Sequence, residues 1–83
     1  MPYTYIVQCA DGTLYTGWTV DLQKRIAAHN AGIGAKYTSC RLPVELVYWE
    51  CQDSQSSAQK REASIKRLSR CQKMALINQN TKS

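Results

Sequence analysis

The sequence predicts a small α+β domain in which helices pack on a three-stranded antiparallel sheet, in the order β-β-α-β-α-α. Two observations indicate this fold. Strand-like segments flank Asp11-Gly12, which favours a β-hairpin, and segments with helical periodicity then surround one further strand-like segment. At 83 residues the chain is too short for a second domain to bury enough surface to fold. We therefore expect one domain over residues 1–83, with its core at about 3–78 and a frayed tail at 79–83.

The hairpin is the first predicted element. Residues 3–9 alternate β-branched and aromatic side chains, and residues 13–18 form the returning strand. Alternation along each strand places Tyr5 and Tyr15 on one face of the hairpin, where their side chains can project side by side. Gly17 falls on the same face and allows another group to come close to the backbone.

A helix follows the hairpin. Its body is residues 22–30, and either Asp21 or Thr19 can cap its first turn. Residues 32–42 begin with a glycine, contain a second glycine and several small polar residues, and are expected to form a loop that ends at Pro43.

The remaining elements are one strand and two helices. Residues 44–51 alternate again and form the third predicted strand. Serines within 54–57 can cap a second helix that runs to Arg70. A capping-box pattern at 69–72 then begins a last short helix over 71–78.

Three polar residues fall on helix faces that should be turned inward. His29 shares a stripe of the first helix with Leu22 and Ile26, and Arg25 lies at the edge of that stripe. Glu62 interrupts the apolar stripe of the second helix. Singly, each has an ordinary explanation: an ion pair on the same helix for Arg25 and Glu62, and a hydrogen-bonded core position for His29. Together they predict a polar site at one edge of the sheet.

Composition and charge limit the partners and the cellular location that we expect for this protein. The net charge is +5, and residues 60–73 carry six basic side chains against Glu62 alone. This basic segment is either a solvated helix face or a surface that binds phosphates. No apolar run approaches membrane-spanning length, and the N-terminus lacks the features of a signal peptide, so we expect no membrane association and a cytoplasmic location.

The four cysteines are at 9, 40, 51 and 71. No two are spaced as a CxxC pair, which zinc sites usually contain. Free thiols are therefore expected.

The polar residues and the hairpin together form a recognisable series. The hairpin contains two short motifs, Tyr3-Thr4-Tyr5 and Tyr15-Thr16-Gly17. Tyr15 follows Tyr5 by ten positions, and Arg25 follows Tyr15 by another ten. His29 lies one turn later, and Glu62 follows on the second helix. This series resembles the GIY-YIG nuclease domain, specifically the small stand-alone bacterial UPF0213 group. The segment GAKYTSCRLPVELVYWE is also typical of that group.

The resemblance implies a metal-dependent endonuclease that hydrolyses phosphodiester bonds in nucleic acid, with DNA as the expected substrate and DNA repair or processing as the expected role. Glu62 would hold a divalent cation, Mg²⁺ or Mn²⁺. The implied catalytic residues are Tyr5, Tyr15, Arg25, His29 and Glu62. The implied nucleic-acid-binding residues are Lys36, Tyr37, Arg41, Lys66, Arg67 and Arg70. Two role assignments stay open: whether His29 transfers a proton or orients a neighbour, and whether Asn78 or Asn80 joins the site.

The sequence also departs from the family pattern. Tyr3 and Thr4 replace the glycine and isoleucine of the first motif, and Trp18 stands where some members have a small or basic polar residue. The additional DNA-recognition domain of larger family members is absent from these residues. Two alternatives therefore remain: a non-catalytic nucleic-acid-binding module of the same fold, and a small adaptor that docks on a protein partner. The oligomeric state is left open.

Overall fold

A computed structural model describes residues 1–81 of the chain. The sheet contains three antiparallel strands in the order β2-β1-β3, with β1 in the centre. The strands are β1 (Tyr3–Gln8), β2 (Leu14–Thr19) and β3 (Glu45–Cys51), and the helices are α1 (Leu22–Asn30), α2 (Lys36–Ser39), α3 (Gln55–Lys66) and α4 (Arg70–Thr81). The predicted α+β class, the antiparallel sheet and the order of the main elements are confirmed.

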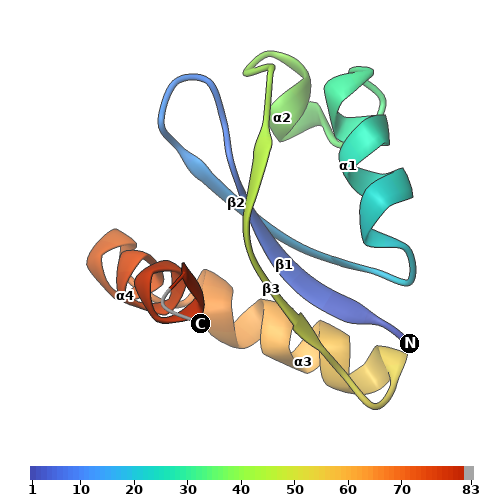
Figure 1. Ribbon diagram of the computed structural model, residues 1–83, viewed down its shortest axis with the longest axis vertical. Coiled ribbons are helices and arrows are strands. Elements are labelled where there is room, and N and C mark those ends of the chain that lie inside the picture. The colour runs from blue at the N-terminus through green and yellow to red at the C-terminus, as the bar shows by residue number, and fades with distance from the viewer. Residues whose placement is uncertain (82–83) are drawn as a thin grey trace.

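The sheet separates two helical layers. Helices α1 and α2 lie on one side of it, and α3 and α4 lie on the other (Figure 1). Each layer has its own apolar core. The first is formed by Tyr5, Val7, Cys9 and Val44 with residues of α1 packed against them. The second is formed by Ile6, Tyr48, Ile65 and Ile77. None of the helices within residues 1–81 is both long and apolar enough to cross a bilayer.

The strand register determines which side chains share a face. Tyr5 of β1 lies opposite Gly17 of β2, and Val7 lies opposite Tyr15. Tyr5 and Tyr15 are thus on the same face, as alternation predicts, but in diagonal positions instead of directly side by side. A bulge between Ile6 and Val7 shifts the pairing of β1 with β3.

Local capping begins the longer helices. The Asp21 carboxylate accepts a hydrogen bond from the Lys24 backbone N–H and starts α1, and Ser54 caps α3 in the same way. The capping box before α4 is complete: the Gln72 backbone donates to the Ser69 hydroxyl, and the Ser69 backbone donates to the Gln72 side chain.

Three differences from the predicted elements exceed one residue. The expected loop at 32–42 contains the single turn α2, whose buried Thr38 is held by a contact with α1 that lies outside any local pattern. The second predicted helix ends at Lys66 instead of Arg70, because the chain reverses at residues 67–69 so that α3 and α4 can pack on the same sheet face. Helix α4 continues past the expected end at 78 to Thr81, so part of the expected tail is helical, and residues 82–83 lie outside the description.

The second core allows a test of this packing. Ile65 is fully buried between α3, the sheet and α4. Replacing Ile65 by alanine should lower the free energy of unfolding by about 2–5 kcal/mol, because the removed methyl groups leave a cavity. Ser64→Ala, an exposed change on the same helix, should shift it by less than about 0.5 kcal/mol in the same urea titration. Equal effects of the two changes would contradict the assigned core.

Candidate active site

Tyr5 is the buried centre of the candidate site. Its side chain is fully inaccessible to solvent, and its hydroxyl is 2.9 Å from Nε2 of His29. Arg25 Nε donates a hydrogen bond of 3.3 Å to the same hydroxyl. Gly17 makes the arrangement possible, since a Cβ at this position would lie only 2.6 Å from the Tyr5 hydroxyl oxygen. Two strands and α1 therefore converge on one phenol.

His29 is also fully buried, and both of its ring nitrogens have partners. Its Nδ1 is 2.8 Å from Oγ1 of Thr38, whose own proton is donated to the Ala35 carbonyl. With its proton directed to that carbonyl, Thr38 accepts from His29, and we therefore assign the proton of the neutral ring to Nδ1. The lone pair of Nε2 then accepts the hydrogen bond from the Tyr5 hydroxyl. In this arrangement each group in the series Tyr5, His29 and Thr38 has a hydrogen-bond partner.

Arg25 lies at the boundary between this buried cluster and solvent. Besides the bond from Nε to Tyr5, a terminal nitrogen donates a hydrogen bond of 2.9 Å to the Gly34 carbonyl. These two bonds fix the plane of the guanidinium. Within residues 1–81 its other N–H groups make no hydrogen bond or ion pair, so they are available to an external anion.

Tyr15 connects the cluster to α2. Its ring lies edge-on to His29, with centroids 5.5 Å apart, and stacks on Tyr37 at 5.7 Å. The Arg41 guanidinium lies 4.2 Å from the Tyr37 centroid and also pairs with Asp11. The Tyr15 side chain is only partly buried, and its hydroxyl makes no hydrogen bond in the described part of the chain. Of the two motif tyrosines, Tyr15 is thus the accessible one.

Glu62 lies on α3, across the sheet from α1, and its charge contributes to the raised pKa of Tyr5. Its side chain is 20% exposed and forms an ion pair of 2.9 Å with Lys66 on the same helix. Helix α3 is attached to the sheet by Thr4, which donates to the Ala58 carbonyl, and by Arg61, which pairs with Glu50 at 2.8 Å. These contacts hold the helix that presents the Glu62 carboxylate.

The pKa values in the cluster favour neutral groups. Burial raises the pKa of Tyr5 above its ordinary value, although the hydrogen bond and charge of Arg25 oppose the rise; the charges of Tyr15 and Glu62 add to it. Burial also lowers the pKa of His29, and the charge of Arg25 lowers it further. Arg25 thus fails to make Tyr5 a stronger acid than an ordinary tyrosine, and the buried pair is neutral near pH 7.

Two residues of the cluster were missed by sequence reasoning. Thr38 sets the His29 tautomer, and Gly34 supplies the carbonyl for Arg25. A Cβ on Gly34 would lie 2.6 Å from Nδ1 and 2.7 Å from Cα of His29, so only glycine fits there. Both residues lie in the segment expected to be loop. Its two glycines were visible in the sequence, but no periodic pattern pointed to their contacts.

The predicted nucleic-acid-binding residues lie in two groups. Lys36, Tyr37 and Arg41 belong to α2 or follow it, and Lys66, Arg67 and Arg70 lie at the junction of α3 and α4. Lys66 is paired with Glu62 and Arg41 with Asp11, whereas the remaining cations form no ion pair within residues 1–81. Asn78 is an exposed residue of α4, and the side chain of Asn80 lies outside the description.

A divalent cation fits the donor chemistry at Glu62. Mg²⁺ and Mn²⁺ prefer carboxylate oxygens and keep most of their bound waters, so one half-buried carboxylate can suffice as the protein ligand. No group of three or more His, Cys, Asp or Glu side chains suited to a metal occurs in residues 1–81, and the four cysteines are free thiols. Binding a cation would require the Lys66 ammonium to leave the carboxylate.

Comparison with known proteins identifies the family. A sequence model described as the GIY-YIG catalytic domain matches residues 1–75, which include every motif residue discussed above. The chain belongs to the GIY-YIG family. This superfamily is one of nucleases, and the predicted resemblance is confirmed.

The relatives place the chain among UPF0213 proteins. It is 57% identical to a UPF0213 protein of Syntrophus aciditrophicus, with 94% of this chain and 91% of the relative covered. It is also 57% identical to one of Halobacterium salinarum, covering 93% of this chain and all of that protein. The second relative is archaeal, so the expectation of a bacterial group was too narrow.

Solved structures agree with the fold. The solution NMR structure of the UPF0213 protein BH0048 from Bacillus halodurans has a TM-score of 0.60 and 43% identity, covering 94% of this chain and 84% of that one. The NMR structure of the E. faecalis protein EF2693 has a TM-score of 0.63 and 38% identity, covering 98% and 86%. Both solved structures therefore share the fold of this chain along nearly its whole length.

The contact between Gly17 and Tyr5 predicts a coupled effect. Gly17→Ala should lower the free energy of unfolding by about 1–3 kcal/mol, because the added methyl group must displace the Tyr5 ring. In a Tyr5→Phe background the penalty should be smaller, since the closest atom, the hydroxyl oxygen, is gone. Urea unfolding of the four proteins measures the coupling. Strictly additive effects would show that the two residues do not meet.

The buried state of His29 predicts a pH dependence. Its folded pKa lies below the ordinary value, so the unfolded chain binds a proton at a higher pH than the folded one does. The free energy of unfolding should therefore decline as pH falls below about 6.5, before the carboxylates titrate. Because the chain has one histidine, its NMR titration is unambiguous. A measured pKa at or above the ordinary value would contradict the assignment.

Proposed function

We propose that this protein is a metal-dependent endonuclease that hydrolyses phosphodiester bonds in nucleic acid, with DNA as the expected polymer. One observation carries the proposal: the Arg25 guanidinium is fixed by two hydrogen bonds while its remaining N–H groups make none within residues 1–81. Family membership, the nearby carboxylate of Glu62 and the net charge of +5 support it.

Arg25 is assigned to the phosphate. A guanidinium donates to two phosphate oxygens at once and remains charged at all relevant pH values. Because its orientation is set before substrate arrives, it can stabilise the extra negative charge of the transition state without reorganising. Tyr5 and Gly34 therefore act through Arg25, as positioning residues.

Tyr15 is assigned to the attacking water. Tyr5 is sealed from solvent, so it cannot touch the substrate in this conformation, whereas the Tyr15 hydroxyl is free to hydrogen-bond to a water molecule. The water oxygen attacks phosphorus and loses a proton to solvent, the bond from phosphorus to the leaving oxygen breaks, and that oxygen takes up a proton from solvent. We therefore propose that His29 orients its neighbours, Tyr5 and the Tyr15 ring.

Glu62 is assigned to the divalent cation. When bound, Mg²⁺ or Mn²⁺ supplies Lewis-acid charge to the phosphate oxygens. The carboxylate holds the ion, and α3 keeps the carboxylate in place through Arg61 and Thr4. Lys66, once released from Glu62, is free to contact the backbone of the nucleic acid.

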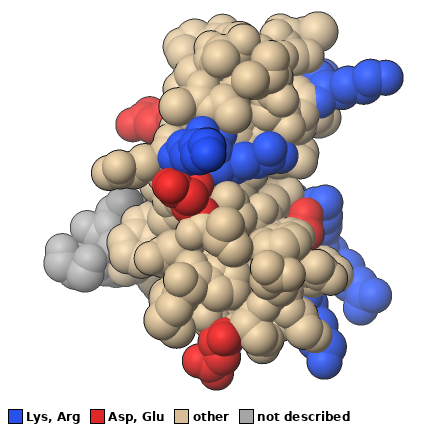
Figure 2. Space-filling model, turned by 90° about the vertical axis from the view of Figure 1, so that its right-hand side faces the viewer, with Lys and Arg blue, Asp and Glu red and all other residues tan. Residues whose placement is uncertain are grey.

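Basic side chains on the surface account for the affinity for nucleic acid. Figure 2 shows basic side chains projecting along one edge of the molecule. Neutralising phosphates there releases counterions and gives binding that weakens with salt and carries no base sequence. The nucleic acid is thus recognised by its backbone.

The Glu62–Lys66 ion pair favours the alternative of a binding module without catalysis, because the only proposed metal ligand is already paired. Divalent-metal dependence separates the two. An enzyme loses cleavage in EDTA and regains it with Mg²⁺ or Mn²⁺, whereas a binding module retains salt-sensitive association under all of these conditions.

Charge removal at Glu62 tests the assignment. Glu62→Gln should abolish cleavage of supercoiled plasmid and oligonucleotides while the fold and nucleic-acid binding survive. Arg25→Ala should reduce cleavage by about 100- to 1,000-fold through the lost transition-state donor. Glu45→Gln, the same charge change at an exposed site on β3, is the matched control and should be fully active. Full activity of a folded Glu62→Gln protein would refute the catalytic assignment.

A further inference from the structure

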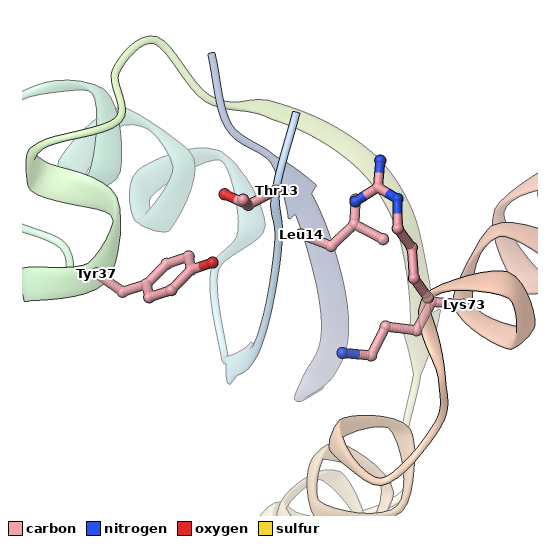
Figure 3. Close-up of a pocket in the computed structure, with 5 residues that line it drawn as sticks. Thr13, Leu14, Tyr37 and Lys73 are labelled. Atoms are coloured by element: carbon pink, nitrogen blue, oxygen red, sulfur yellow. The ribbon is translucent and has the colours of Figure 1, made fainter. Parts of the chain in front are cut away.

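A cavity of about 230 Å³ lies beside the candidate active site. It is bounded by the start of β2, by α2 and by the first turn of α4. Its lining residues are Thr13, Leu14, Tyr37, Arg70 and Lys73. Figure 3 shows the Lys73 ammonium and the Tyr37 hydroxyl directed into the space between α4 and α2 from opposite sides. Three segments far apart in the sequence thus form one polar hollow.

The charge in this cavity is uncompensated. Arg70 and Lys73 are three residues apart on α4, where like charges repel one another. Neither forms an ion pair with any carboxylate in residues 1–81. Asp11, in the hairpin turn two residues before Thr13, already accepts hydrogen bonds from Thr13 and pairs with Arg41. Two unpaired cations on one wall favour binding of an anion.

Tyr37, on the opposite wall of the cavity, can donate a hydrogen bond, but its ring is not free to stack on a nucleobase. The ring of Tyr37 is packed against Tyr15 and the Arg41 guanidinium, so a nucleobase would have to displace one of them. Its hydroxyl makes no hydrogen bond in the described structure and remains available. This combination, two cations and one neutral donor, suits a phosphate and offers little to a base.

The position of the cavity identifies which phosphate. Thr13 and Leu14 directly precede Tyr15 in the chain, and Tyr37 stacks on Tyr15. Successive phosphates along one strand are close together, about 3.4 Å of helix axis apart. We propose that this cavity is an anchoring subsite for an internucleotide phosphate near the scissile one on the same strand. The subsite holds the strand in register while Arg25 engages the scissile phosphate.

This inference rests on the proposed function only in taking nucleic acid as the ligand, so its test omits metal and measures binding alone. The probe is a short fluorescein-labelled oligothymidylate, titrated in EDTA at several salt concentrations. The pocket variant is Arg70→Gln with Lys73→Gln. The control is Lys24→Gln with Lys60→Gln, which removes the same charge from two exposed positions outside the cavity. Circular dichroism and thermal melting confirm that each variant is folded.

Loss of one phosphate contact in the pocket variant should make the slope of log affinity against log salt shallower by about 0.7, the value for a single-stranded probe. The control should change the slope by less than half as much. Tyr37→Phe should weaken binding about 2- to 10-fold at fixed salt with no change of slope, since it removes a neutral hydrogen bond. The effects should be the same for probes with a 5′-hydroxyl and a 5′-phosphate.

Four results would overturn the inference. Equal slope changes in the pocket and control variants would mean that only general surface charge matters. A loss seen solely with the 5′-phosphate probe would assign the cavity to strand ends. No binding of the probe by the unaltered protein would overturn both this inference and the proposed function, whereas retained binding with an unchanged slope would contradict the subsite alone.

Discussion

The candidate site depends on the burial of one phenol hydroxyl. Tyr5 is completely enclosed, and an enclosed hydroxyl without partners would destabilise the fold. Its partners are His29 and Arg25 from α1, which must therefore approach the hairpin closely. Gly17 leaves the space for this approach. The packing of the first helix on the sheet and the geometry of the site are consequences of the same hydrogen bonds.

The burial of Tyr5 has a second consequence: neutral groups lie deep in the site, and charged groups lie near its surface. The buried layer holds neutral groups, since burial raises the pKa of Tyr5 and lowers that of His29. The charges of Arg25 and Glu62 lie at the rim, where both are partly accessible. The buried neutral groups keep the Arg25 guanidinium oriented, and its remaining N–H groups are left to donate hydrogen bonds to an anion. The site is therefore organised before any substrate binds.

Sequence patterns were sufficient where a structure depends on neighbours in the chain. A helix cap at Asp21 or Thr19, the capping box at 69–72 and the shared face of Tyr5 and Tyr15 all follow from spacings of a few residues. Sequence patterns failed to predict elements and boundaries that depend on contacts between distant segments. The turn α2 exists because Thr38 bonds to His29, and α3 ends early because the next helix must reach the same core. Neither contact leaves a periodic signal in the sequence.

The sequence by itself determined the elements, the family motif and the identities of the polar residues that fall on apolar faces, because helix and strand periodicities fix which side chains share a face. Only the tertiary structure decided that Tyr5 is sealed while Tyr15 is accessible, and that Gly34 and Thr38 complete the cluster. The reason is physical: the burial of a hydroxyl and the tautomer of an imidazole depend on groups brought together from separate segments, and their distances are set by packing across the sheet.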